Sequence, residues 1–135
     1  MNLFEKNNSS LYSKRTPLKL VPGAIHLWLA FSDEIRDASL LKVYYGLMTS
    51  EERERCNRFR FARHQHQFTV TRALVRTTLS RYSHLQPHEW RFEKNKYGRP
   101  EIKGEQNSLG LRFNLSHTNG LIVCGLIKDA PKAEC

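Results

Sequence analysis

Residues 25–31 carry a large apolar side chain at every second position. The apolar positions are Ile25, Leu27, Leu29 and Phe31. A period of two is typical of a β-strand with one buried face, so we predict a strand here whose apolar face lies in the core. His26 falls within this pattern, and we interpret it as a strand residue without a catalytic role.

The following segment changes to helical spacing. Apolar residues recur three or four positions apart, at Ile35, Ala38, Leu41, Tyr45 and Met48. This spacing predicts a core-facing helix, with N-capping oxygens supplied by residues 32–33. A second helix is predicted over about residues 50–60, because Thr49 and Glu52 have the spacing of a capping box. A third is predicted over about residues 62–83, which contain neither Gly nor Pro.

The last third of the chain changes to strands and turns. Strands are predicted over residues 90–93, 101–102, 111–115 and 121–127. Residues 116–120 are expected to connect the last two strands, because Asn119-Gly120 is a strong turn signal. One strand, three helices and then several strands indicate an α+β domain. We place that single domain at residues 23–135, after a flexible leader at 1–22 whose polar residues and prolines oppose regular structure.

The composition excludes some classes of protein. Hydrophobic residues make up 39% of the chain, and no apolar run approaches the roughly 18 to 20 residues that a membrane-spanning helix needs. The amino terminus shows no secretory signal, so we expect a cytoplasmic protein without a membrane partner. The cysteines are Cys56, Cys124 and Cys135. They are too few and too far apart for a disulfide framework, and we interpret them as reduced thiols.

The charge balance favours an anionic ligand. The net charge is +9, and residues 53–76 contain seven arginines against one acid, Glu54. Arginine forks suit phosphate oxygens, although such a run taken alone is more often a solvated basic face. Nucleic acid, an acidic protein or a phosphorylated cofactor would all satisfy this charge.

Two further groups of polar residues are candidate sites. Ser116 and His117 fall in the expected tight connection, where a hydroxyl, an imidazole and backbone N–H groups could converge on an anion. No G-x-S-x-G surrounds Ser116, which disfavours a serine hydrolase. His64 and His66 stand two positions apart on a predicted helix and so face different ways, which disfavours a metal site.

Several motifs resemble a known enzyme family. They are Phe113-Asn114-Leu115-Ser116-His117-Thr118, the turn Tyr97-Gly98-Arg99-Pro100, and the helical segments 50–59 and 71–76. In register from about residue 25 to the end, the chain is similar to the surfactin-synthetase-activating class of 4′-phosphopantetheinyl transferases. The resemblance implies one α+β lobe of a fold in which two similar lobes pack about a pseudo-twofold axis. Coenzyme A and Mg²⁺ would then lie in the cleft between the lobes.

The same resemblance implies an activity and a set of binding residues. These enzymes transfer the phosphopantetheine arm of coenzyme A to a serine of an acyl or peptidyl carrier protein. By position, Arg55 matches a contact to coenzyme A phosphate, and Arg99 matches a basic residue near the 3′-phosphoadenosine. Ser116 and His117 match a pair that binds the nucleotide's phosphates, so we predict that Arg99 and His117 face one anion site. Arg76 matches a recurrent basic helix position.

The sequence departs from the family pattern in two places. Glu52 stands where many relatives carry a phosphate-binding lysine, although Arg53 or Arg55 could compensate. Relatives continue into G-[IV]-D-x-E, whose acids bind Mg²⁺, and later into W-x-x-K-E, whereas this sequence ends at Cys135. We therefore expect no catalytic residue and no metal ligand in this chain, and no activity from it alone. We also expect it to self-associate or to pair with a carboxy-terminal lobe.

Two other functions stay open from the sequence. A small basic nucleic-acid-binding module is favoured by the charge and by aromatic residues among Lys and Arg. These aromatic residues are Trp90, Phe92, Tyr97 and Phe113. A non-catalytic subunit or adaptor is the third possibility. Transfer from a pyrophosphate depends mainly on positioning and charge neutralisation, which suits a chain that supplies basic groups and favours the transferase.

Overall fold

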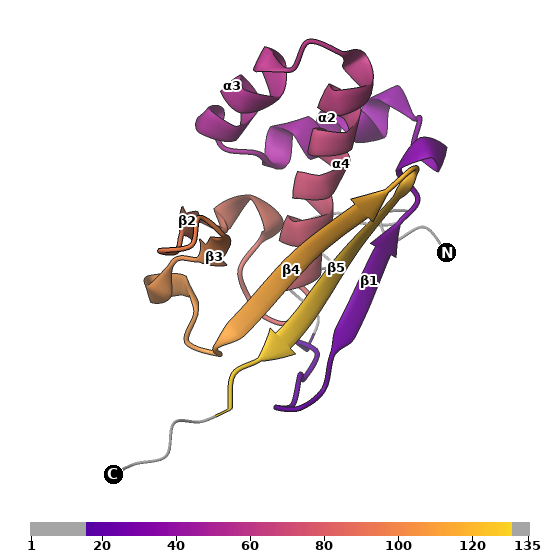
Figure 1. The fold of residues 1–135 in the computed structure, drawn as a ribbon. Coiled ribbons are helices and arrows are strands. Elements are labelled where there is room, and N and C mark those ends of the chain that lie inside the picture. The colour runs from indigo at the N-terminus through magenta and orange to yellow at the C-terminus, as the bar shows by residue number, and fades with distance from the viewer. Residues whose placement is uncertain (1–15, 131–135) are drawn as a thin grey trace.

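The computed structural model describes residues 16–130, which fold into an α+β domain (Figure 1). Its helices are the 3-10 helix η1 (Ser32–Glu34), α2 (Ala38–Leu47), α3 (Ser50–Arg58), α4 (Ala62–Leu79), and the 3-10 helices η2 (Pro87–Glu89) and η3 (Gly104–Gln106). Its strands are β1 (His26–Ala30), β2 (Phe92–Lys94), β3 (Pro100–Ile102), β4 (Leu111–Thr118) and β5 (Leu121–Lys128). The fold class predicted from the sequence is confirmed.

Two antiparallel sheets form the β part of the domain. The larger has the strand order β1-β5-β4, and the smaller is the β2-β3 ribbon. β4 and β5 form a hairpin in which Thr118 pairs with Leu121, so Asn119-Gly120 is a two-residue turn. Gly120 has φ +75°, a conformation that glycine adopts without steric cost. The predicted turn is confirmed, but β4 runs three residues further than expected, because Ser116, His117 and Thr118 pair with β5.

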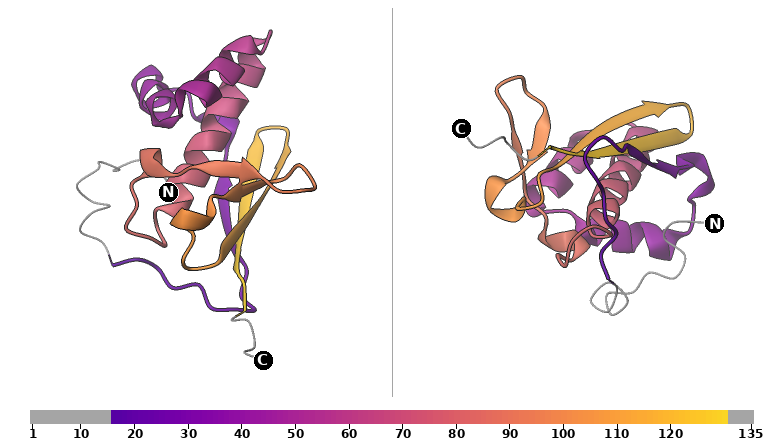
Figure 2. Two further views of the ribbon diagram at one scale, coloured as in Figure 1. Left: turned by 90° about the vertical axis from the view of Figure 1, so that its left-hand side faces the viewer. Right: turned by 90° about the horizontal axis from the view of Figure 1, so that it is seen from below.

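The long helix α4 is the centre of the hydrophobic core. It lies along one face of the larger sheet, with α2 and α3 on its other side (Figure 2). Val70, Ala73, Leu74, Val75 and Leu79 are fully buried there. They pack with Ile122, Cys124 and Leu126 of β5 and with Trp90. This burial explains why 18 residues with little helical amphipathicity form one continuous helix.

The helix starts follow capping chemistry, with one correction. Asp37, and not the predicted residues 32–33, caps α2, because its Oδ1 accepts hydrogen bonds from the backbone N–H groups of Ser39 (2.8 Å) and Leu40 (3.2 Å). The predicted capping box of α3 is confirmed. Thr49 Oγ1 accepts from the Glu52 N–H at 3.2 Å, and Glu52 Oε1 accepts from the Thr49 N–H at 2.9 Å.

The predicted orientation of β1 is wrong. Trp28 and Ala30 face the core, and Trp28 Nε1 donates a hydrogen bond to the Tyr82 hydroxyl at 2.8 Å. His26 shares this face, with Nδ1 2.7 Å from the same hydroxyl, which agrees with a strand residue held by its neighbours. The expected core residues point the other way. Their exposed fractions are 68% for Ile25, 62% for Leu27, 46% for Leu29 and 54% for Phe31.

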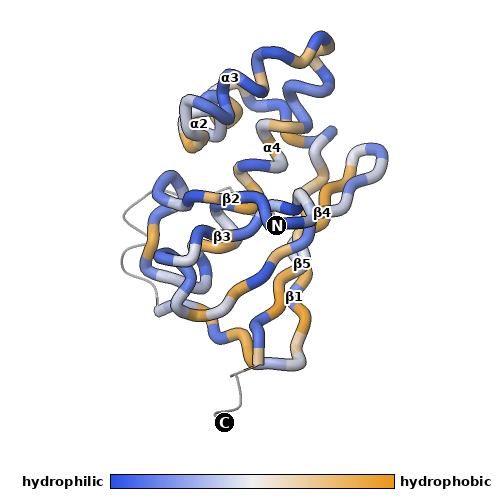
Figure 3. Tube along the Cα trace, turned by 60° about the vertical axis from the view of Figure 1, so that its left-hand side comes forward, coloured by the Kyte–Doolittle hydropathy of each residue, from blue (hydrophilic) through white to orange (hydrophobic). Residues whose placement is uncertain are grey.

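These side chains belong to an apolar outer face of the larger sheet, which we call the outer face. Leu27 pairs with Gly125 and Leu29 with Val123, so residues of β5 extend the same face, and Ile127 on it is 40% exposed. Hydrophobic segments follow β1 and β5 (Figure 3). Within residues 16–130, the helices lie on the opposite side of this sheet (Figure 2).

The other departures from the predicted pattern lie at the ends of elements. Trp90, predicted to start a strand, is buried at 1% exposure, and its Nε1 donates to Ser80 Oγ at 2.9 Å. Residues 18–20 fall within the expected leader but contact the domain. The Leu18 N–H donates to the Arg81 carbonyl at 2.8 Å, and Leu20 belongs to the core. The rest of the expected leader, residues 1–15, lies outside the described residues.

Candidate anion-binding site

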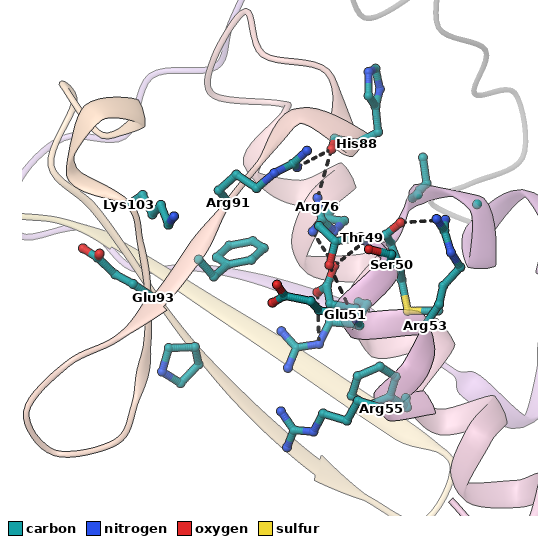
Figure 4. Close-up of a pocket in the computed structure, with 18 of the residues that line it drawn as sticks. Thr49, Ser50, Glu51, Arg53, Arg55, Arg76, His88, Arg91, Glu93 and Lys103 are labelled. Carbon is teal, nitrogen blue, oxygen red and sulfur yellow. Dashed lines mark hydrogen bonds and ion pairs between the residues drawn. The ribbon is translucent and has the colours of Figure 1, made fainter. Parts of the chain in front are cut away.

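A basic hollow of about 840 Å³ lies between the helices and the β2-β3 ribbon. Its basic lining residues are Arg53, Arg55, Arg72, Arg76, His88, Arg91, Lys94 and Lys103. Figure 4 shows Arg55 on the α3 side of this hollow and Lys103 on the opposite side. Residues from two helices and from the ribbon therefore bring positive charge to one concave surface, which suits a ligand that carries several phosphate groups.

Arg76 joins α4 to the rest of the domain on the floor of the hollow. Its side chain is fully buried and donates to the carbonyl oxygens of Pro87 (3.0 Å) and Trp90 (2.9 Å) and to Glu52 Oε1 (2.5 Å). Burial lowers the pKa of Arg76, and the charge of Glu52 acts in the opposite direction. Both terminal nitrogens of Arg76 are engaged by the protein, so Arg76 connects α4 to α3 and to residues 87–90 beneath the hollow.

Besides the predicted capping box, Glu52 has a structural role that the sequence did not reveal. The same carboxylate completes the capping box of α3, accepts from Arg76, and lies 3.6 Å from Arg72 Nε through Oε2. Glu52 thus neutralises the buried Arg76. A lysine at position 52 would instead place a second positive charge beside Arg76. Arg72 and Arg76 balance the negative charge of Glu52, and both arginines still line the hollow.

Arg72 is the residue that sequence reasoning passed over. Its guanidinium carbon lies 5.2 Å from the ring centroid of Phe68, and that of Arg55 lies 5.7 Å from the same centroid. Burial lowers the pKa of Arg72, and the charges of Arg55 and Arg76 lower it further, while Glu52 opposes them. Two guanidinium groups held at one ring repel each other, so a bound anion would relieve that repulsion. The signal in the sequence was the spacing of Phe68 and Arg72, one helical turn apart.

Arg99 lies at a second hollow, of about 870 Å³, beside the β2-β3 turn and β4. Asn95 shapes this turn, since its Oδ1 accepts from the N–H groups of Tyr97 (2.8 Å) and Arg99 (3.0 Å), and Gly98 has φ +79°. Pro100 lines both hollows, so the two adjoin. The structure does not place Arg99 with Arg55 in one hollow.

Ser116 and His117 lie on β4 and not in a tight connection as predicted. They pair with Val123 and Ile122, and successive strand residues point to opposite faces of a sheet. Both are exposed, and neither lines either of the two hollows. The predicted meeting of Arg99 and His117 at one anion site is not formed by the described residues alone, and it stays a prediction.

The remaining sequence candidates have structural partners. His66 Nε2 lies 2.8 Å from the Ser32 carbonyl oxygen, and the His64 ring contacts Phe59 and Phe61. Among residues 16–130, no three His, Cys, Asp or Glu side chains form a group that could hold a metal ion. Within the same range, no helix combines the length and apolar character needed to cross a membrane.

The described cysteines are free and buried. Cys56 of α3 has its sulfur 3.5 Å from Thr69 Oγ1 of α4, and Cys124 lies in the core. Burial raises the pKa of the Cys124 thiol to about 12, which keeps it protonated and unreactive near neutral pH.

Comparison with known proteins identifies the class. The family model described as 4′-phosphopantetheinyl transferase, N-terminal, matches residues 37–126. The chain is 32% identical over 109 residues to the 4′-phosphopantetheinyl transferase HetI of Nostoc sp., covering 81% of this chain and 45% of HetI. It is 30% identical over 81 residues to the 4′-phosphopantetheinyl transferase Sfp of Bacillus subtilis, covering 60% of this chain and 35% of Sfp.

A third relative is the phosphopantetheinyl transferase of Thraustochytrium sp., at 31% identity over 104 residues, 76% of this chain and 35% of the relative. The chain therefore belongs to the 4′-phosphopantetheinyl transferase family, a family of transferases. It spans less than half the length of these curated relatives.

Proposed function

We propose that this chain is the coenzyme A phosphate-binding lobe of a 4′-phosphopantetheinyl transferase. The complete enzyme would transfer phosphopantetheine from coenzyme A to a serine of an acyl or peptidyl carrier protein. The observation that carries this proposal is the basic hollow, in which Arg55 and Arg72 lie at the ring of Phe68. Family membership supplies the reaction class. A cytoplasmic location, expected from the sequence, forms part of the proposal.

The hollow suits the leaving half of coenzyme A. Phosphoryl-type transfer from a pyrophosphate requires positioned positive charge more than covalent help from the protein. All three arginines line the hollow, but they differ in their partners. Arg55 forms no ion pair within residues 16–130, and Arg72 forms only the longer one to Glu52, at 3.6 Å. Both terminal nitrogens of Arg76 are engaged by Glu52 and backbone carbonyls. We assign phosphate contact to Arg55 and Arg72 and a supporting role to Arg76. Arg99, Ser116 and His117 are proposed to contact the nucleotide from the neighbouring hollow and from β4.

Mg²⁺ is implied by the resemblance, but the described residues do not fit it. They contain no group of three acids, histidines or cysteines close enough to ligate a metal ion. We therefore derive no step through a metal in this lobe. Deprotonation of the carrier serine is likewise assigned to residues outside residues 16–130.

We further propose that the outer face of the sheet packs against a second lobe. Ile25, Leu27, Leu29 and Phe31 expose apolar side chains there, and exposed apolar area of this kind marks an interaction surface. This chain spans 45% of the length of the Nostoc relative, which leaves length for a lobe of similar size. In the absence of a second lobe, the same face would associate with another copy of the chain.

The alternative of a nucleic-acid-binding module loses its main support. It relied on aromatic residues that could stack on bases, but Trp90 is buried, and the rings of Phe92 and Phe113 contact each other at 5.5 Å against the core. Of those four aromatic residues, Tyr97 alone is largely exposed, at 76%. One exposed ring does not form the row of stacking surfaces that single-stranded nucleic acid requires.

A competition experiment tests the proposed function. A fluorescent coenzyme A analogue is bound to the full chain, and adenosine 3′,5′-bisphosphate is added as competitor. Displacement by the bisphosphate supports the proposal. Displacement by long single-stranded DNA alone, with a steep dependence on salt, would contradict the proposed transferase function and support the nucleic-acid-binding module.

A second experiment addresses the division of labour. Coenzyme A, Mg²⁺ and an apo carrier protein are incubated with the full chain, and the carrier is weighed by mass spectrometry. We expect a phosphopantetheine mass shift only when a separately expressed carboxy-terminal lobe is added. A shift produced by the chain alone would show that the second lobe is not required.

A further inference from the structure

The corner between α3 and α4 is exposed, basic and aromatic. Phe61, the residue before α4, is 44% exposed. The guanidinium carbons of Arg60 and Arg63 lie 5.6 Å and 4.6 Å from its ring centroid. Arg58 ends α3 on the same turn and is also exposed. We call these four residues the arginine corner.

None of the three arginines of the arginine corner forms an ion pair within residues 16–130. Residues 55–88 contain neither Asp nor Glu. The ion pairs within residues 16–130 use Arg36, Arg72, Arg76 and Arg112. The positive charge of the corner is thus available to a partner, unlike the charge of Arg76, which Glu52 neutralises.

A row of rings joins the arginine corner to the basic hollow. The Phe61 ring contacts His64 at 5.6 Å, and His64 contacts Phe59 at 6.2 Å. Phe59 in turn contacts Phe68 at 5.5 Å, and Phe68 lines the hollow beside Arg55. Three successive ring contacts therefore separate the corner from the hollow, a span that a docked macromolecule can cover to reach the proposed phosphate site.

We propose that the arginine corner docks an acidic surface of the protein that accepts the transferred group. This inference rests on the proposed function, because the acceptor must reach the ligand in the adjoining hollow. Carboxylates of a partner would bridge the guanidinium groups of Arg60 and Arg63, and Phe61 would contribute apolar contact between them. Arginine and aromatic residues are enriched in protein interfaces, and complementary charge steers such encounters.

The geometry favours an acidic protein over nucleic acid. Two guanidinium groups already lie within 5.6 Å of the Phe61 ring centroid, so a base has little open ring surface to stack on. The same guanidinium groups can still donate to carboxylates through their N–H edges. A phosphate backbone or an anionic membrane would use only the charge, and both are outcomes of the test.

The test measures binding of an acidic apo acyl carrier protein to the full chain at low and moderate salt. We expect Arg60→Glu combined with Arg63→Glu to weaken the carrier affinity by about tenfold or more, since interfacial like charges repel. Lys19→Glu with Lys128→Glu is the matched control, because it makes the same change of net charge at two residues outside the corner, one before β1 and one at the end of β5. That control should change the affinity by no more than about twofold. Circular dichroism checks that each variant is folded.

Further variants and ligands make the result decisive. Arg60→Lys with Arg63→Lys should keep part of the affinity, and Phe61→Ala should reduce it at unchanged net charge. Equal weakening by the corner and control variants, or no carrier binding by the unaltered chain, would overturn the proposal. So would tighter corner-dependent binding of single-stranded DNA or of phosphatidylserine vesicles. Adenosine 3′,5′-bisphosphate binding is measured in parallel, and its absence in the unaltered chain would remove the proposed function independently.

Discussion

On β1 and β5, the inner and outer faces of the larger sheet have similar apolar character and different surroundings. On β5, Leu126 faces α4 with no exposed surface, while Ile127, the next residue, is 40% exposed on the outer face. On β1, Trp28 is packed against the core and Leu27 is 62% exposed. The comparison teaches that a strand can carry two apolar faces, of which this lobe covers only one. The second is the face that we propose packs against a second lobe.

The largest expected difference between the faces is in stability. Leu126→Ala should lower the free energy of unfolding by about 2 to 5 kcal/mol, because it leaves a cavity under α4. Leu27→Ala makes the same chemical change on the outer face and should cost less than about 1 kcal/mol. Urea unfolding of both variants at low protein concentration measures this difference. Equal losses would mean that the outer face is already covered in solution.

The second prediction concerns His117 on β4 and its proposed contact with coenzyme A. In the complete enzyme, His117→Ala should weaken coenzyme A binding by roughly tenfold or more, given about 1.5 to 3 kcal/mol for a hydrogen bond to a charged group. His64→Ala is the matched control, since His64 contacts Phe59 and Phe61 away from β4. Equal changes of kcat/KM for coenzyme A in the two variants would contradict the assignment of His117.

The sequence predicted the fold in outline because its strongest signals are local. The Thr49 and Glu52 capping box and the Asn119-Gly120 turn depend only on neighbouring residues, and both are present. The orientation of β1 was predicted wrongly, because the larger apolar residues occupy its outer face. The alternation of residues along β1 does not indicate which of its two faces α4 covers. On the inner face, Trp28 and His26 both contact the hydroxyl of Tyr82, which lies more than fifty residues away in the chain.

The candidate site was predictable in part for the same reason. The run of arginines in residues 53–76 indicated a basic surface, and Arg55 from that run lines the basic hollow. The role of Glu52 depends on Arg76, 24 residues further along, and no local pattern reveals such a pair. The extension of β4 through Ser116 and His117 depends on pairing with β5, which the turn-like residues themselves do not indicate.

The third prediction concerns association through the outer face. We expect the full chain to self-associate, and Leu27→Lys with Leu29→Lys to weaken that association by about tenfold or more, because it places charges in an apolar contact. Sedimentation velocity over a range of protein concentrations measures the effect. Lys substitutions at Val43, an exposed apolar residue of α2, are the control. If the Val43 variant dissociates equally, the contact does not involve the sheet.

The smallest expected effect is the pH dependence that Cys124 gives to the inner face. Burial raises the pKa of its thiol from 9.0 to about 12, so above pH 9 the thiol ionises in the unfolded chain and stays neutral in the folded one. Its contribution to stability is complete below pH 9 and is lost as the pH rises towards 12. Linkage gives a loss of about 1 kcal/mol between pH 9 and pH 10. Cys124→Ala should remove this part of the slope. It should also remove a smaller part that comes from Tyr82, because burial raises the pKa of Tyr82 and the charge of Cys124 raises it further. Urea midpoints at the two pH values measure the difference, and identical slopes would show that water reaches the thiol beneath α4.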